Sequence, residues 1–327
     1  MSTRPPLRIA IDSGGTFTDC VWLQGSDLRI LKVFSTPADP AQAIAEAVLK
    51  IAGAIQDIIV LHGTTVGTNT LLQRKGASVA FVTTKGFEDS IEIGRQERPK
   101  LYDFFFEKDP ALAPAELRFG VDERTSAEGA VLRAPSAASL ETLVEQVAAQ
   151  KPQAVAISLL FSFANPQNEK AVAAALARLN LPLSVSHKIL PEFREYERAS
   201  TVLVNAYLQP VMQGYLQKLQ ERTGEGGKRA RIFVMQSSGG ITALKTAAEQ
   251  PVRTVLSGPA GGIVGAAAVA QRSGFDRIIT FDMGGTSSDI ALVDGRPSTT
   301  NEADVAGLPV RVPVLDIHTV GAGGGSL

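Results

Sequence analysis

The stretch Asp12-Ser13-Gly14-Gly15-Thr16, followed by Asp19, recurs near the other end of the chain as Asp282-Met283-Gly284-Gly285-Thr286, followed by Asp289. Every identical residue of the second copy lies 270 positions after its counterpart in the first. Each copy stands between two apolar runs, at residues 7–11 and 20–23 in the first and at residues 278–281 and 290–293 in the second. We therefore predict two strand–turn–strand units whose turns face each other across a cleft.

The residue types in these turns favour a phosphate ligand. A pair of glycines permits a tight turn and lets backbone N–H groups approach a ligand closely, and successive N–H groups form a concavity that holds anions. A threonine hydroxyl donates to a phosphate oxygen, and an aspartate at a strand end holds Mg²⁺ directly or through water. Because Asp and Gly are also ordinary hairpin residues, one copy alone would fit a plain turn equally well. Two matching copies favour a site for a metal-chelated polyphosphate.

The composition indicates a globular protein with two domains or subdomains. The chain has 327 residues, of which 44% are hydrophobic and 20% charged, as in soluble domains. The net charge of −1 makes nucleic acid and anionic membrane improbable partners. Cys20 is the only cysteine, which excludes a disulfide framework and a cysteine zinc cluster. Residues 1–6 lack an apolar signal segment, and the apolar run at residues 259–270 is too short to span a bilayer. A cytoplasmic location is expected.

Apolar strands alternate with amphipathic helices along the chain, which predicts an α/β fold. Several strands are apolar throughout, as suits a sheet covered on both faces. Strands are predicted at residues 8–12, 20–23, 58–62, 78–83, 154–160, 231–235 and 278–282. Helices are predicted at residues 41–52, 136–150, 165–179 and 200–222, with Asp39-Pro40 and Asn165-Pro166 as start signals. Residues 98–133 have poor periodicity and are interpreted as an irregular insertion, a candidate lid.

Other glycine-rich segments carry weaker signals. Residues 224–228 fail the P-loop pattern because Arg229 stands where Ser or Thr is needed, and neither GxGxxG nor GxSxG occurs in the sequence. Residues 257–262 are expected to open a helix, either to hold phosphate at its N-terminus or to allow close packing against a sheet. Residues 321–325 either let the backbone approach an adenosine moiety or form a flexible terminus.

The chain has three histidines, His62, His187 and His318. His62 follows a predicted strand, where an active-site loop is expected, although a structural role fits equally well. Asp316 and His318 are two candidate metal ligands on one face of an extended segment, with an ordinary surface position as the favoured alternative. His187 is interpreted as structural.

The sequence resembles the hydantoinase A/5-oxoprolinase family of the actin–hexokinase–Hsp70 superfamily. The matching motifs span nearly the whole chain and lie at residues 11–19, 62–69, 92–96, 197–207, 236–240, 257–262, 281–289 and 320–326. The resemblance implies an actin-like ATPase fold of the ribonuclease H-like type, with the first half-domain and the start of the second. It also implies an N-terminal hydantoinase/oxoprolinase domain at residues 1–200 and the start of a catalytic domain at residues 201–327.

The resemblance further implies ATP-dependent opening of a cyclic amide such as a hydantoin or 5-oxoproline, with ATP phosphorylating the amide carbonyl. Hydrolysis is then shared with a B-type subunit. The implied cofactors are ATP and Mg²⁺. Cofactor-binding residues would be Gly14, Gly15, Thr16, Gly284, Gly285, Thr286, Gly323 and Gly324. Asp12 and Asp282 would hold the metal and, with His62, serve catalysis. Arg95 and Arg198 would be cleft residues, as candidates for substrate binding.

One departure from the family pattern concerns length. Family members usually continue for several hundred residues beyond the glycine-rich segment, so we expect either a B-type partner or a missing C-terminal region to complete the site. We also expect an uncovered apolar sheet face near residues 278–293 and little ATPase activity from this chain alone. Two alternatives stay open: the equivalent subunit of an ATP-dependent ketone carboxylase, and a non-catalytic interaction subunit that keeps only the fold.

Overall fold

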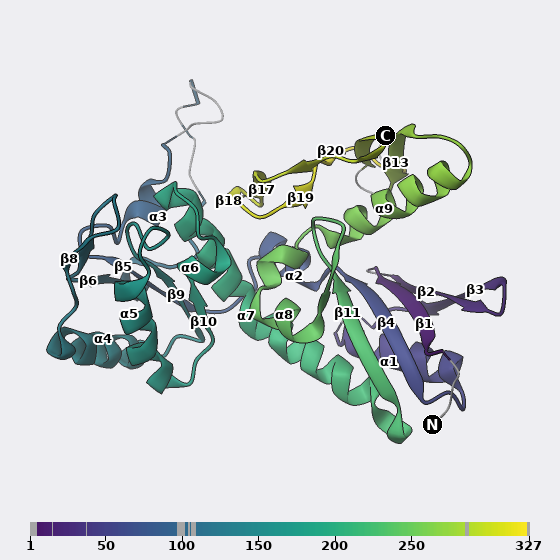
Figure 1. Ribbon diagram of the computed structural model, residues 1–327, viewed down its shortest axis with the longest axis horizontal. Helices are drawn as coiled ribbons and strands as arrows, with labels where there is room; N and C mark the ends of the chain where they lie inside the picture. The colour runs from purple at the N-terminus through teal and green to yellow at the C-terminus, as the bar shows by residue number, and fades with distance from the viewer. Residues whose placement is uncertain are drawn as a thin grey trace. The chain divides into compact units, whose positions relative to one another are not determined.

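The computed structural model describes residues 5–14, 16–36, 38–96, 102–103, 105, 109–284 and 288–325. The fold is α/β, as predicted, and it forms two compact units between which the chain passes back and forth (Figure 1). The first unit comprises Met1–Asn69, Met212–Asn301 and Pro313–Leu327, and the second comprises Thr70–Val211 and Glu302–Val312. The domain boundary that the resemblance implies near residue 200 stays a prediction, because the division of the structure into compact units does not test it.

The first unit is built on a six-stranded sheet with the strand order β12-β11-β4-β1-β2-β3. Strands β1 (Leu7–Ser13), β2 (Phe17–Gln24) and β3 (Asp27–Phe34) form an antiparallel meander. Strand β4 (Asp57–Thr64) pairs in parallel with β1, and β11 (Arg229–Met235) pairs in parallel with β4. The short β12 (Ile241–Ala243) closes the far edge.

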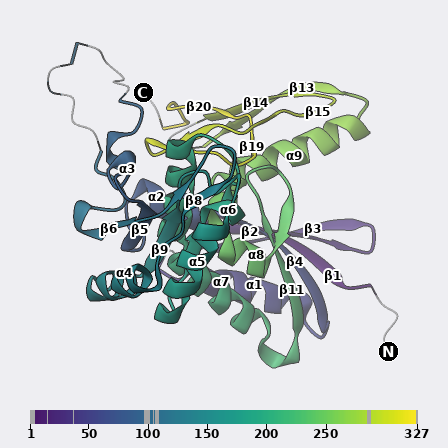
Figure 2. The same cartoon turned by 60° about the vertical axis from the view of Figure 1, so that its left-hand side comes forward.

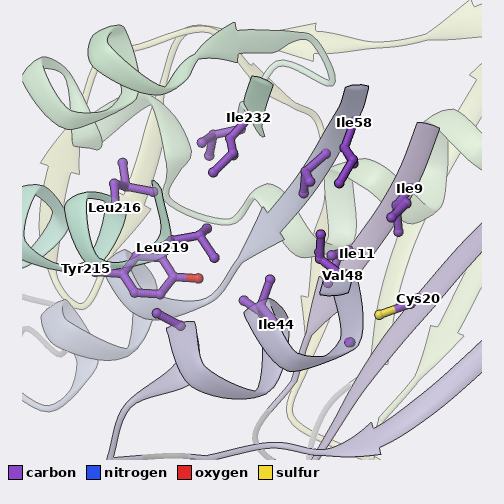
Figure 3. Packing of buried hydrophobic residues seen from close by; sticks show 14 of the residues in the cluster. Ile9, Ile11, Cys20, Ile44, Val48, Ile58, Tyr215, Leu216, Leu219 and Ile232 are labelled. Atoms are coloured by element: carbon purple, nitrogen blue, oxygen red, sulfur yellow. The ribbon is translucent and has the colours of Figure 1, made fainter. Parts of the chain in front are cut away.

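One face of this sheet is covered by α1 (Pro40–Ala52) and by the C-terminal part of α7 (Glu195–Thr223). Alternation along β1 buries Ile9 and Ile11 on that face, while Asp12 belongs to the opposite one. Figure 3 shows Ile9 and Ile11 beside Ile44 and Val48 of α1, with Tyr215 of α7 in the same cluster. Because this apolar core takes up the side chains on one face of β1, only those on the opposite face, such as Asp12, are available to a ligand.

The first unit also holds a smaller sheet near its C-terminal end. Its main strands are β13 (Arg277–Met283) and β14 (Ser288–Asp294), joined by β15 (Arg296–Pro297) and by β20 (His318–Val320), both of which pair with β14. Helix α9 (Ser257–Arg272) lies along this sheet (Figure 2) and packs apolar side chains against it, including Ile263 of the helix and Val293 of β14. One face of the β13–β14 hairpin is thereby covered.

The second unit contains a four-stranded parallel sheet with the order β10-β9-β5-β6. These strands span Leu183–Val185, Ala154–Ser158, Val79–Thr84 and Arg118–Val121, respectively. Helices α4 (Ala137–Ala149) and α5 (Gln167–Leu176) cover it with an apolar core. Ser136 caps α4 by accepting from the Ser139 N–H. Asn165, one residue before the N-cap Pro166 of α5, accepts from the Gln167 N–H. Asp39 is the N-cap of α1, as its signal predicts, but its side chain makes no capping hydrogen bond.

Shorter elements connect these layers. The short helices are α2 (Val66–Leu72), α3 (Ser90–Ile93), α6 (Ser186–Ile189) and α8 (Leu244–Glu249), with 3-10 turns η1 (Ala115–Leu117), η2 (Ala177–Leu179), η3 (Glu225–Gly227) and η4 (Pro251–Thr254). The short strand pairs are β7 (Arg124–Thr125) with β8 (Val131–Arg133), β16 (Thr299–Thr300) with β19 (Val314–Leu315), and β17 (Ala303–Val305) with β18 (Leu308–Val310). No helix within the described residues is both long and apolar enough to cross a membrane.

One expectation about local structure is wrong, and one strand was missed. Residues 98–133 are not simply an irregular insertion, because residues 118–121 form β6 and add a strand to the sheet of the second unit. Residues 98–101, 104 and 106–108 of that segment lie outside the described residues. Strand β3 was not predicted, since its apolar residues form neither a continuous run nor a strict alternation. His187 lies in the short helix α6.

Candidate nucleotide-binding site

The two copies of the repeated motif form hairpins with the same register. Asp12 pairs with Asp19 across β1 and β2, and Asp282 pairs with Asp289 across β13 and β14. The repeat in the sequence is therefore a repeat in the structure, with both aspartates at the same position before the turn. Gly15, Gly285 and Thr286, which were predicted to hold phosphate, lie outside the described residues.

The first turn is held in place by the end of β3. The Gly14 N–H donates to the Phe17 carbonyl at 3.0 Å, and the Ser35 hydroxyl donates to the Gly14 carbonyl at 2.8 Å. The Ser35 N–H donates to the Thr16 carbonyl at 2.9 Å. A Cβ atom on Gly14 would lie 3.1 Å from the Phe17 carbonyl oxygen, which leaves little room for a side chain. The side chain of Thr16 is exposed and has no part in these contacts, so its hydroxyl is accessible to a ligand.

The second turn is bordered by the glycine-rich segment at residues 321–325. The Gly324 N–H donates to the Gly284 carbonyl at 2.9 Å. The Ser288 hydroxyl donates to the Ala322 carbonyl at 2.7 Å. The structure thus brings Gly324 and its neighbour Gly323 next to the second turn, rather than leaving them in a free terminus.

Asp282 lies close enough to Asp12 to act on its carboxyl electrostatically. The Asp12 side chain touches solvent, but the protein around it desolvates it in part and raises the pKa of its carboxyl. The negative charges of Asp19 and Asp282 raise that pKa further. Two aspartates from elements 270 residues apart in sequence therefore contribute to one acidic site.

Glycines flank both carboxylates. A Cβ atom on Gly63, at the end of β4, would lie 3.2 Å from Oδ1 of Asp12. A Cβ atom on Gly262, in the first turns of α9, would lie 4.0 Å from Oδ2 of Asp282. The backbone of β4 and the N-terminal part of α9 therefore border the acidic site, and Gly63 is the position where an added side chain would displace a carboxylate. Both glycines belong to motifs singled out in the sequence, although neither was assigned a role.

The acidic site suits a hydrated divalent cation. Among the described residues, neither Asp12 nor Asp282 pairs with a lysine or arginine, whereas Asp19 pairs with Lys32 at 2.9 Å. In that part of the chain no group of three or more His, Cys, Asp or Glu side chains is placed to hold a metal. Two carboxylates without a cationic partner fit Mg²⁺, which keeps several waters and takes few protein ligands.

His62 does not lie in a loop beside Asp12, and this expectation is corrected. His62 is within β4, opposite Ile11, while Gly63 is opposite Asp12. Because side chains alternate across a strand, His62 faces the core and Asp12 the other side of the sheet. His62 is 1% exposed, and its Nε2 shares a hydrogen bond of 2.5 Å with the Tyr215 hydroxyl. Burial lowers the pKa of the imidazole from 6.5 to about 4. Tyr215 had no signal in the sequence beyond its place in a helix.

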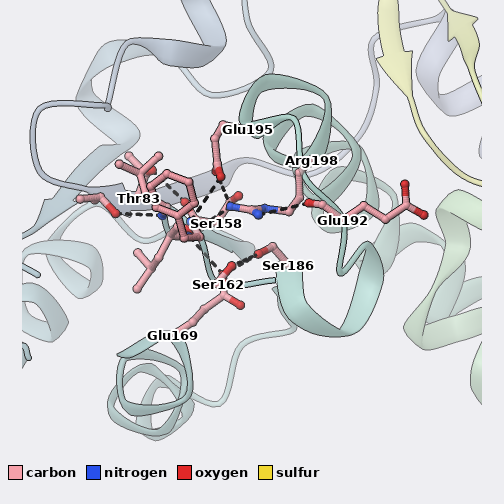
Figure 4. A network of polar contacts seen from close by, with 12 residues as sticks. Thr83, Ser158, Ser162, Glu169, Ser186, Glu192, Glu195 and Arg198 are labelled. Carbon is pink, nitrogen blue, oxygen red and sulfur yellow. Dashed lines mark hydrogen bonds and ion pairs between the residues drawn. The ribbon is translucent and has the colours of Figure 1, made fainter. Parts of the chain in front are cut away.

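Arg198, which the resemblance implied as a cleft residue, does not line a cleft either. Its side chain is fully buried in the second unit, where it forms an ion pair with Glu195 and donates to the Leu159 carbonyl at 2.6 Å (Figure 4). A guanidinium held in this way is part of the core and does not meet a substrate. Arg95 is about half exposed and pairs with Glu197 in the same unit.

The other two histidines are placed as follows. His187 Nδ1 lies 2.5 Å from the buried Glu169 carboxylate, which also accepts from the Ser186 hydroxyl, so its structural interpretation fits the contacts. His318 lies exposed in β20, opposite Ile290 of β14. Asp316 is exposed and donates its backbone N–H to the Ser298 carbonyl.

A meander followed by parallel strands, with a second hairpin of identical register and an aspartate before each turn, is the architecture of the actin-like ATPase fold. The chain belongs to the hydantoinase/oxoprolinase family. Residues 8–179 match the family model "Hydantoinase/oxoprolinase N-terminal region", and residues 198–327 match the model "Hydantoinase/oxoprolinase". The family resemblance and the fold class drawn from the sequence are thus confirmed.

The known relatives are longer than this chain. Caprolactamase subunit alpha of Pseudomonas jessenii is 36% identical over 99% of this chain and 49% of its own length. The 5-oxoprolinase of Saccharomyces cerevisiae is 30% identical over 98% of this chain and 28% of its own length. The crystal structure of the ATP-dependent caprolactamase from Pseudomonas jessenii superposes with a TM-score of 0.86 at 34% identity over 97% of this chain and 48% of that one. A nucleotide-free acetone carboxylase gives 0.85 at 28% identity over the same shares.

Proposed function

We propose that residues 1–327 form the ATP-binding part of an enzyme that opens a cyclic amide. The observation that supports this proposal is that two hairpins of the same register carry Asp12 and Asp282, and that Asp282 is near enough to raise the pKa of the Asp12 carboxyl. Relatives named 5-oxoprolinase and caprolactamase subunit alpha support the substrate class. The chain spans about half the length of the caprolactamase subunit, so we assign it the ATP-binding part of that activity and not the whole.

Within this proposal, the carboxylates of Asp12 and Asp282 hold Mg²⁺ or its waters. The turns at residues 14–16 and 284–286 hold the phosphates through backbone N–H groups and threonine hydroxyls. Gly323 and Gly324 let the backbone lie close to the nucleotide. When bound, ATP supplies the phosphoryl group that activates the amide carbonyl toward water. The contribution of these residues is positioning and charge neutralisation, which dominate phosphoryl transfer.

The substrate contacts and the water-activating group would come from polypeptide beyond this chain, either a B-type subunit or a region that completes the fold. His62 and Arg198 are withdrawn as candidates for direct contact, because both are buried away from solvent. Arg95 is the candidate that keeps substantial exposure, although it already pairs with Glu197.

A second candidate function is the ATP-binding part of a ketone carboxylase. The close superposition on acetone carboxylase favours it, with a TM-score of 0.85. Both candidates use the same nucleotide site and differ in the acceptor. ATP hydrolysis stimulated by cyclic amides would support the first, and hydrolysis that requires both a ketone and bicarbonate would support the second.

The test is calorimetric titration of the 327-residue chain with Mg²⁺–ATP, beside Asp12→Asn and Asp282→Asn. We expect saturable binding that depends on Mg²⁺ and that each substitution weakens by about tenfold or more, since each removes one of two carboxylates from the cation. Asp27→Asn is the matched control, because Asp27 is an exposed aspartate at the start of β3. If Asp12→Asn, Asp282→Asn and the control Asp27→Asn bound Mg²⁺–ATP equally well, the two aspartates would not form the site. Absence of binding by the folded wild type would equally contradict a site formed by the two turns of this chain.

A further inference from the structure

The segment at the end of β4 adjoins the first turn of the nucleotide-binding site. Thr64, the last residue of β4, lies opposite Ser13 in the parallel ladder, one position after Gly63. The Thr65 hydroxyl donates to the Ser13 carbonyl at 3.2 Å, which holds the start of the first turn. This segment belongs to a motif singled out in the sequence, although its threonines were assigned no role.

The same segment holds the start of helix α9 through two hydrogen bonds. The Leu256 N–H donates to Oγ1 of Thr68, in α2, at 2.9 Å. The Ser257 hydroxyl donates to the Thr64 carbonyl at 3.2 Å. Ser257 and Thr64 are each 1% exposed, so water does not compete for this second bond. The first residues of α9 are therefore tied to the end of β4.

Leu256 has a backbone conformation that leucine rarely adopts. Its φ of 62° and ψ of 25° lie in the left-handed region, where a residue with a Cβ atom is strained. Such a conformation persists only where its surroundings hold it. Thr68 holds the N–H of Leu256, and the Ser237 hydroxyl, just after β11, donates to the carbonyl of the preceding Val255. Groups that follow two neighbouring strands therefore fix the point at which the chain turns into α9.

Helix α9 in turn carries the second hairpin. Ile263 of the helix belongs to one apolar cluster with Val293 of β14. A Cβ atom on Gly262 would lie 4.0 Å from Oδ2 of Asp282. Asp282 thus lies beside the first turns of a helix whose start is tied to β4, while Asp12 lies on β1, which pairs with β4. The two hydrogen bonds at the start of α9 therefore link the supports of the two carboxylates.

We propose that Thr68 and Ser257 are positioning residues of the nucleotide-binding site. They set where α9 begins relative to β4, and through α9 they set the spacing between Asp282 and Asp12. The inference rests on the proposed function, because it concerns the same pair of aspartates. A cation held by both carboxylates requires them at one spacing, so a shift of about 1 Å in one of them should weaken binding by about tenfold or more.

The contacts favour a positioning role over direct binding of phosphate at the start of α9. Ser257 is buried and donates its one hydroxyl proton to the Thr64 carbonyl, so it has none left for a phosphate oxygen. Oγ1 of Thr68 accepts the Leu256 N–H, a bond that orients the backbone without any ligand. Thr68→Val removes this acceptor and keeps the shape of the side chain, whereas Thr68→Ser keeps the acceptor.

Calorimetric titration with Mg²⁺–ATP tests the proposal. We expect Thr68→Val and Ser257→Ala each to weaken binding by about tenfold, and Thr68→Ser to bind within about twofold of the wild type. Thr223→Val is the matched control, because it removes a buried threonine hydroxyl of the same unit, which donates to the Leu219 carbonyl at the end of α7. It should lower the urea midpoint of unfolding, as Thr68→Val does, and leave the affinity unchanged. Equal losses of affinity in Thr223→Val and Thr68→Val would show a general effect of lower stability and overturn the proposal.

A double-mutant cycle tests whether Thr68 acts through Asp282. In an Asp282→Asn background, Thr68→Val should weaken binding by less than about twofold, since the carboxylate that it positions is already gone. A loss of about tenfold in both backgrounds would show that Thr68 acts independently of Asp282 and would overturn the proposal. Unchanged affinity in Thr68→Val and Ser257→Ala would overturn it too, yet leave the proposed function intact. If Asp12→Asn and Asp282→Asn also bound as the wild type does, the proposed function itself would fail.

Discussion

Replacing His62 with glutamine removes a buried group whose charge the folded protein cannot tolerate. His62 is 1% exposed, and burial holds the pKa of its imidazole at about 4 instead of 6.5. Glutamine has a similar size, cannot take up a proton in this range, and can still hydrogen-bond to the Tyr215 hydroxyl. The substitution therefore isolates the contribution of one titrating side chain to stability.

The sign and size of the effect follow from linkage between protonation and folding. The folded state binds the His62 proton more weakly than the unfolded state, so the unfolded state holds more protons between pH 4 and 6.5. Stability supplied by neutral His62 is present above pH 6.5 and is lost as the pH falls toward 4. A difference of about 2.5 pKa units corresponds to roughly 3 kcal/mol in the free energy of unfolding.

The assay is urea unfolding of the wild type and His62→Gln at a series of pH values from about 7 to about 4.5. The stability of the wild type relative to the variant should fall by about 1 kcal/mol per pH unit around pH 5. A constant offset of about 1–2 kcal/mol from the altered hydrogen bond is independent of pH. His318→Gln serves as control, because His318 is exposed. A difference between wild type and His62→Gln that stays constant across this range would refute the reasoning.

Three further predictions concern single side chains. Gly63→Ala should weaken Mg²⁺–ATP binding by about tenfold, because its Cβ would lie 3.2 Å from Oδ1 of Asp12; calorimetry checks this, and unchanged affinity would show that the carboxylate is free to move. Arg198→Ala should lower the free energy of unfolding by about 3–5 kcal/mol, measured with urea, because it leaves Glu195 without its buried partner. Burial, and to a smaller extent the charge of Asp19, raises the pKa of the Cys20 thiol to about 11. Because only the thiolate reacts, alkylation at pH 8 should be about 200-fold slower in the folded protein than in urea.

Much of the fold could be predicted from local patterns. The two Asp–Gly–Gly–Thr stretches, their flanking apolar runs and the start signals at Asp39-Pro40 and Asn165-Pro166 all correspond to observed hairpins and helices. These features depend on residues that are close together in sequence, so local patterns were enough to predict them. Strand β3 was missed because its apolar residues form neither a continuous run nor a strict alternation.

The sequence by itself determined the repeated hairpins, the α/β class and the family. Only the tertiary structure decided which side chains share a surface. His62 and Gly63 are adjacent in sequence, yet strand alternation sends His62 to the core and leaves Gly63 beside Asp12. The motif around Arg198 suggested a residue that binds substrate, but its side chain is fully buried. An ion pair with Glu195 and a hydrogen bond to the Leu159 carbonyl stabilise the buried charge. Contacts between residues far apart in the chain depend on packing, and a local pattern cannot specify them.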